Sequence, residues 1–159
     1  MSEEIKPIKR SKELAPLSRE HHEGLLLGWK IKQGLKNGTD HSLIAQYIQW
    51  FWEAELQEHF RKEEEVLAIH LPADNEWLVK MQEEHDDIRA RIYLIAQITD
   101  EDLFIQLAKA IQEHIRFEER TLFPFAEKVI PLAEMEAIYA ELIKTKEKDK
   151  WEQEFWLKK

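Results

Sequence analysis

Residues that end helices are scarce in this 159-residue chain, which contains four glycines and five prolines. A sequence with so few breaks leaves few places where a helix could stop. Its commonest side chains include Glu, Lys, Leu, Gln and Ala, which are strong helix formers. No segment shows the strict alternation of apolar and polar residues that is typical of a strand. The sequence therefore predicts an all-α protein.

Capping residues and apolar periodicity divide the chain into five expected helices. They cover about 17–36, 41–69, 75–98, 100–125 and 131–156. Gly38 fits a left-handed cap after the first helix. Thr99 and Asp102 resemble a capping box before the fourth. Short connections make consecutive helices antiparallel, so we expect an up-down-up-down four-helix bundle with an additional C-terminal helix.

One domain is expected, because no linker or low-complexity segment interrupts the pattern. Residues 1–16 form a charged N-terminal arm, and residues 17–130 form the four-helix bundle. Residues 131–159 form the C-terminal helix, which packs on the bundle or on the partner of a homodimer. The tryptophans near its end favour such an interface.

Charge and composition exclude several functional classes. The net charge is -9, with Lys and Arg interspersed with Glu, so no basic stripe is available for nucleic acid. The chain has no cysteine, which excludes disulfides and thiol catalysis. No apolar run approaches the roughly 20 residues that span a bilayer. The first ten residues, MSEEIKPIKR, lack the apolar core of a signal peptide, so a cytoplasmic location is expected.

The positions of the seven histidines indicate a buried site. At ~100° of rotation per residue, four expected helices each point one histidine toward the core. These are His21, His59, His85 and His114. A lone inward histidine is usually a satisfied core residue, but four at comparable depth each need a partner for a desolvated imidazole. His22 is turned one step from His21, whereas His41 and His70 lie at expected helix ends and are interpreted as surface or capping residues.

Two of these histidines are followed by a glutamate four residues later. Glu63 follows His59, and Glu118 follows His114, in two His-x3-Glu units. Spacing of i,i+4 places both side chains on one face of a helix. A bound cation would satisfy the buried imidazoles and balance the buried carboxylates.

This donor set predicts a metal site. Imidazole and carboxylate without thiolate suit iron, manganese or zinc, and the ligands suffice for two metals bridged by carboxylates. Glu64 and Glu119 are expected to point away from the inward face into solvent, and Glu55 is a minor inward candidate. A ferritin-like di-iron site is disfavoured, because its Glu-x-x-His motif occurs nowhere in the chain.

Four segments carry a resemblance to a known family. In order along the chain they are LSREHHEGLLLGWKI, HFRKEEEVL, EEHDDIR and HIRFEERTLFP. Together, over roughly residues 14–126, they resemble the hemerythrin-like (HHE cation-binding) family. The resemblance implies a four-helix bundle with a non-haem di-iron centre whose His-x3-Glu glutamates bridge the metals. By position, the implied ligands are His21 or His22, His59, Glu63, His85, His114 and Glu118. We expect His21 to bind, with His22 as a fifth histidine.

The chain departs from the oxygen-carrying hemerythrins at two positions. Those proteins have a second histidine one turn after the third-helix histidine, where this chain has Arg89. They also have an aspartate five residues after the fourth-helix histidine, where this chain offers Glu118 at four and Glu119 at five. Arg89 is either a surface arginine or a partner of Glu63 or Glu118.

The expected function is binding rather than catalysis. Apolar neighbours such as Leu25, Trp52 and Met81 indicate a dry pocket for a small gas. The favoured interpretation is a protein with two iron ions that binds dioxygen or a related small diatomic ligand, or that stores or senses iron; manganese and zinc are alternatives. A second interpretation is an oxidoreductase on the same centre, of the peroxidase, nitric-oxide-handling or iron–sulfur repair type. A third is a metal-poor helical interaction module.

Overall fold

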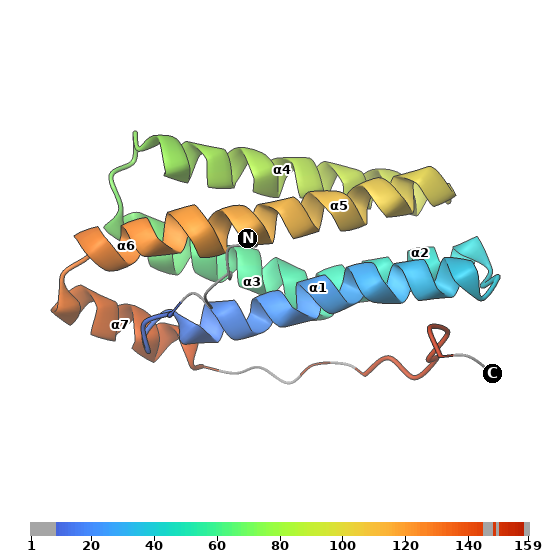
Figure 1. The fold of residues 1–159 in the computed structure, drawn as a ribbon, viewed down its shortest axis with the longest axis horizontal. Coiled ribbons are helices and arrows are strands. Elements are labelled where there is room, and N and C mark those ends of the chain that lie inside the picture. Colours follow the sequence, from blue (N-terminus) through green and yellow to red (C-terminus); the bar gives the residue numbers. More distant parts are fainter. Residues whose placement is uncertain (1–8, 145–147, 149, 158–159) are drawn as a thin grey trace, which may run out of the picture.

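Four long helices lie side by side in the computed structural model, which describes residues 9–144, 148 and 150–157 (Figure 1). The first and third are α1 (Ala15–Lys36) and α4 (Glu76–Gln97). The second is made of α2 (His41–Phe51), η1 (Trp52–Leu56), α3 (Gln57–Arg61), η2 (Lys62–Leu67) and η3 (Ala68–His70). The fourth comprises α5 (Glu101–Phe117), η4 (Glu118–Leu122) and α6 (Phe123–Val129), and α7 (Leu132–Leu142) follows. The described residues contain no strand and no helix suited to crossing a membrane, and the predicted all-α bundle is confirmed.

Side-chain caps define where α2, α4 and α5 begin. Asp40 accepts a hydrogen bond from the Ser42 amide at 3.1 Å, and Asn75 caps α4. Gly38 has the expected positive φ of 72° after α1. The predicted capping box at Thr99 is wrong, because the Asp100 carboxylate caps α5 and accepts from the Asp102 amide at 2.7 Å.

The apolar core forms two clusters, one on either side of a band of buried histidines and glutamates. On α4, His85 lies between Met81 of one cluster and Ile88 of the other. The other three long helices repeat this order. The polar band therefore crosses the middle of the bundle and is shielded from solvent at both ends.

Two π-helical turns lie where the buried glutamates stand. Glu63 is in η2, and Glu118 is the first residue of η4. Each turn closes with an i→i+5 bond, from the Ala68 amide to the Glu63 carbonyl and from the Phe123 amide to the Glu118 carbonyl. Single π turns inside α-helices recur at functional sites. The wider turn rotates the chain less per residue, so the residue after each glutamate stays closer to the interior.

The C-terminal helix is much shorter than predicted. It ends at Leu142, and the described residues after 144 are not helical. The sequence KTKEKDK over 144–150 has no apolar side chain to continue an amphipathic stripe. The aromatic residues beyond it pack on this chain's own bundle: Phe155 is 9% exposed and lies against Gly34.

Candidate metal centre

Six of the seven predicted metal-binding residues converge in the polar band. They are between 0% and 5% exposed, and we call them the inner cluster: His21, His59, Glu63, His85, His114 and Glu118. They form two overlapping groups in which the ligand atoms lie within 4.8 Å of one another. One group adds His21 and His59 to the two glutamates, and the other adds His85 and His114. Both carboxylates are therefore shared between two adjacent positions.

All four imidazoles turn the Nε2 atom toward the shared carboxylates. His21 Nε2 lies 2.8 Å from Glu118 Oε1, and His85 Nε2 lies 3.0 Å from Glu63 Oε1. The two His-x3-Glu units bring His59 Nε2 to 3.2 Å from Glu63 and His114 Nε2 to 3.3 Å from Glu118. The i,i+4 prediction of a shared face is correct for both pairs.

The inner cluster leaves four buried polar atoms without a hydrogen-bond partner. They are His59 Nε2, His114 Nε2, Glu63 Oε2 and Glu118 Oε2. Elsewhere in the described residues, only Arg10 Nε and Trp50 Nε1 share this condition. An unsatisfied buried polar group costs roughly 1–3 kcal/mol, and more when charged, so four in one place require a partner. Imidazole nitrogens and carboxylate oxygens are metal ligands, so these four atoms fit a bound metal ion such as iron, manganese or zinc.

A second set of carboxylates holds the outer nitrogen of each histidine. These outer carboxylates are Glu20, Glu64, Glu84 and Glu119. Their distances to the Nδ1 atoms of His59, His85, His114 and His21, in that order, are 2.9, 2.6, 2.8 and 3.2 Å. A carboxylate only accepts, so Nδ1 donates and Nε2 is left free to bind a metal. Each long helix supports the histidine of the next one, and the fourth supports the first, so the ring is closed.

A comparison with protein families agrees with this geometry. The family model of the hemerythrin HHE cation-binding domain matches residues 12–126. The chain belongs to this family. No curated protein and no solved structure matched the chain. Membership in a cation-binding hemerythrin family and the buried His/Glu cluster together indicate a metal-binding protein.

The outer carboxylates were not recognised in the sequence. Glu64 and Glu119 were expected in solvent, and this is wrong, because the π turns bring them to His85 and His21. A signal was nevertheless present: each outer carboxylate directly adjoins an inner-cluster residue in the chain. In this bundle, the inner residue of each adjacent pair thus faces the site, and the outer carboxylate beside it faces the neighbouring helix.

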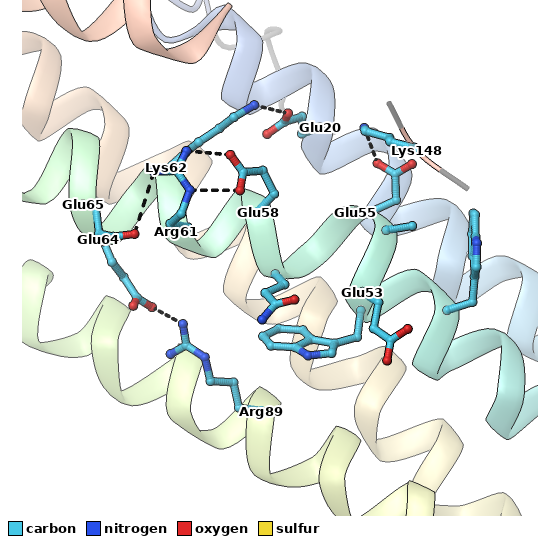
Figure 2. A pocket seen from close by; sticks show the side chains of 14 residues that line it. Glu20, Glu53, Glu55, Glu58, Arg61, Lys62, Glu64, Glu65, Arg89 and Lys148 are labelled. Atoms are coloured by element: carbon cyan, nitrogen blue, oxygen red, sulfur yellow. Dashed lines mark hydrogen bonds and ion pairs between the residues drawn. The ribbon is translucent and has the colours of Figure 1, made fainter. Parts of the chain in front are cut away.

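One cation pairs with each outer carboxylate. The pairs are Arg10–Glu119 at 3.0 Å, Lys62–Glu20 at 3.0 Å, Arg89–Glu64 at 2.8 Å and Lys80–Glu84 at 3.0 Å. Figure 2 shows two of them, Lys62 reaching Glu20 and Arg89 reaching Glu64. Arg89 therefore bonds neither inner glutamate, contrary to the predicted functional alternative. It acts on His85 through Glu64.

His22 is not brought to the inner cluster. It is exposed on α1, one residue step away from the buried His21, and belongs to neither group. His41 begins α2 and His70 ends η3, where His70 pairs with Glu134 at 3.0 Å. Four histidines, one from each long helix, face the shared carboxylates.

In the absence of metal, the buried carboxylates of the inner cluster favour protonated imidazoles. Burial lowers the pKa of His85, but the carboxylates of Glu118 and Glu63 outweigh it and raise this pKa to about 11. Burial likewise lowers the pKa of His114, and Glu118 raises it to about 9. Conversely, burial raises the pKa of each inner glutamate, while the histidines lower it more strongly. Metal binding would replace protons on these imidazoles.

Two hollows adjoin the inner cluster. A small cavity of about 20 Å³ has His21, His59 and His114 on its polar side, with apolar walls that include Ile111 and Ile115. A surface groove of about 630 Å³ runs along η1, α3 and η2 (Figure 2). Glu20 and Glu55 line both hollows, so the small cavity adjoins the groove at these two carboxylates. Glu55, the minor sequence candidate, pairs with Lys148 at 2.7 Å.

Proposed function

We propose that the chain is a non-haem di-iron protein that binds dioxygen or a related small diatomic ligand. The observation that carries the proposal is the set of four unpartnered buried ligand atoms arranged in two groups around shared carboxylates. Only one oxygen of each inner glutamate accepts a hydrogen bond from an imidazole, while its second oxygen and the Nε2 atoms of His59 and His114 form none. Two cations would satisfy every one of these atoms.

The six inner residues would divide into bridging and terminal ligands. Glu63 and Glu118 would bridge the two ions, and each ion would take two of the four histidines. Two bridged iron ions would supply a redox couple and coordination positions open to a small ligand. The outer carboxylates would keep each Nε2 aimed inward by binding Nδ1–H, which also raises the basicity of the imidazole. Manganese or zinc would suit the same donors, and elemental analysis separates the three.

The small cavity limits the size of the ligand. Its volume of about 20 Å³ is close to the space that one water molecule needs. Its walls are mainly apolar, so a diatomic gas fits better than an organic substrate. Gly24 lines the cavity, and a Cβ there would lie 2.9 Å from Ile115 Cδ1. The absence of a side chain at this position preserves the space beside His21.

A second candidate function is turnover of peroxide or nitric oxide on the same centre. The observation favouring it is that Glu20 and Glu55 reach the small cavity from the solvent-facing groove. Carboxyl groups can deliver protons to a reacting ligand, which a reversible carrier does not require. This candidate shares every metal ligand with the first.

Ligand cycling tests the proposal. The reduced, iron-loaded chain is exposed to dioxygen or nitric oxide, and the visible spectrum is recorded before exposure, after exposure and after removal of the gas. A spectral change that reverses supports a binding protein. Continuous consumption of peroxide or nitric oxide with an electron donor supports the oxidoreductase instead. An iron-loaded chain that responds to none of these ligands contradicts both.

A further inference from the structure

Arg10 binds an outer carboxylate of the candidate metal centre from outside the matched family domain. The match begins at residue 12, and Arg10 lies before it in the arm that precedes α1. Its guanidinium joins two carboxylates: Nη1 lies 2.6 Å from Glu127 and Nη2 lies 3.0 Å from Glu119. Glu119 in turn accepts from His21 Nδ1 at 3.2 Å. One hydrogen-bonded path therefore leads from the arm to an inner histidine.

An aromatic contact makes a second path between the same two residues. The Arg10 guanidinium lies 5.3 Å from the centre of the Phe123 ring. Phe123 is stacked on His21, with ring centres 5.3 Å apart and planes only 6° from parallel. The Arg10 side chain is 8% exposed, and Ser18 fixes Glu119 further by donating from Oγ at 2.9 Å. Contacts with the arm thus support both the orientation of the His21 ring, through Phe123, and the hydrogen bond from its Nδ1, through Glu119.

The cations on the other metal position are more exposed. His85 and His114 are supported through Arg89 and Lys80, whose side chains are 33% and 47% exposed. Both come from α4, inside the matched domain. Water and salt screen exposed pairs far more than buried ones, so Lys80 constrains its histidine less than Arg10 does.

We propose that Arg10 is a positioning residue for His21, and that the N-terminal arm thereby slows metal release from the position formed by His21 and His59 with the two glutamates. The inference rests on the proposed di-metal function. The two metal positions are then unequal. The arm supports the position of His21 and His59, whereas the position of His85 and His114 depends on the more exposed cations of α4.

Timed chelation of the metal-loaded, full-length chain tests this inference. Arg10→Gln removes the charge and both carboxylate bonds, and we expect one of the two metals to leave several-fold faster than in the wild type. Arg10→Lys keeps the charge but cannot bridge two carboxylates as a guanidinium does, so we expect an intermediate rate. Glu127→Gln weakens the outer anchor of Arg10 and the bond that Glu127 accepts from the Ser11 amide, and it is expected to shift the rate in the same direction, by less.

Two control variants separate positioning from general loosening. Lys12→Gln changes an arm cation that lies 5.4 Å from the Tyr139 ring, and release should match the wild type. Lys80→Gln should accelerate release less than Arg10→Gln. In the zinc-loaded chain, nitrogen NMR should show faster solvent exchange of the His21 Nδ1 proton in Arg10→Gln, with the other three histidines unchanged.

Three results would overturn the inference. The first is that Arg10→Gln releases both metals at the wild-type rate. The second is that this variant releases both metals faster to the same extent and loses the NMR signals of all four histidines. An effect of Lys12→Gln as large as that of Arg10→Gln would assign the result to arm docking in general. A wild-type chain that binds no metal would overturn the proposed function itself, a result visible before any variant is made.

Discussion

At the scale of single residues, the two ring nitrogens of each inner histidine face different carboxylates. Nε2 faces the shared glutamates, and Nδ1 is held by an outer carboxylate. The inner glutamates and the outer carboxylates therefore act on different atoms of the same ring. Substitutions in the inner cluster and in the outer carboxylates should therefore have separable effects.

The first prediction concerns an inner histidine. His59→Ala should lower the metal content. Because metal binds only the folded state, its loss should also reduce the free energy of unfolding, by roughly 3 kcal/mol at a hundredfold excess of metal over Kd. Elemental analysis and thermal melting measure the two effects. His22→Ala is the matched control, because His22 is exposed and should leave both unchanged. Equal behaviour of the two variants would contradict the assignment of the ligands.

The second prediction concerns an outer carboxylate. Glu84→Gln replaces the anion that accepts from His114 Nδ1 at 2.8 Å, while keeping the size of the side chain. Partners of this kind change metal affinity by about 10- to 100-fold, so we expect a loss within that range without unfolding. Competition with a chelator measures the affinity. Glu113→Gln, an exposed neighbour of His114, is the control, and an equal loss there would refute the role given to Glu84.

Sequence reasoning reached the inner residues but not their supports. The i,i+4 spacing identified His59 with Glu63, because an α-helical turn relates the two positions directly. The pairing of Glu20 with His59 depends on how α1 faces α3, which no periodicity within one helix contains. The partner of Arg89 was missed for the same reason.

At the scale of elements, capping chemistry located the starts of α2 and α4 but chose the wrong cap for α5. The π turns were not predictable, because 100° per residue assumes a regular α-helix, and the error accumulates at Glu64 and Glu119. The prediction of a long C-terminal helix was wrong for a different reason. Helix propensity alone favoured it, but most helical stability comes from packing an apolar face, and the segment 144–150 has none.

The third prediction concerns the packing of α1 against its neighbours. A Cβ at Gly34 would lie 2.7 Å from the Phe155 ring, so Gly34→Ala should displace Phe155 and lower the melting temperature. A Cβ at Gly28 would meet only Ala108, at 3.5 Å, so Gly28→Ala should stabilise the helix by up to about 1 kcal/mol. Denaturant unfolding compares the two variants. The same sign of change in both would contradict the packing described for the C-terminal residues.

At the scale of the whole molecule, the bundle places a charged layer between two apolar clusters. Such a layer is costly to bury unless its charges are balanced, and the closed ring of outer carboxylates and cations balances only its outside. The inside, where four atoms lack partners, is the part that a metal would complete. Four helices that each supply one histidine and one outer carboxylate thus form a single site.

Metal content per chain, measured by elemental analysis on freshly purified wild-type protein, tests the central claim most directly. The two groups that share Glu63 and Glu118 predict two metal ions per chain, with iron as the main metal. The metal should leave on prolonged chelation and return when iron is added back. A chain that stays metal-free in the presence of excess iron, or that saturates at one ion, would contradict the di-metal account.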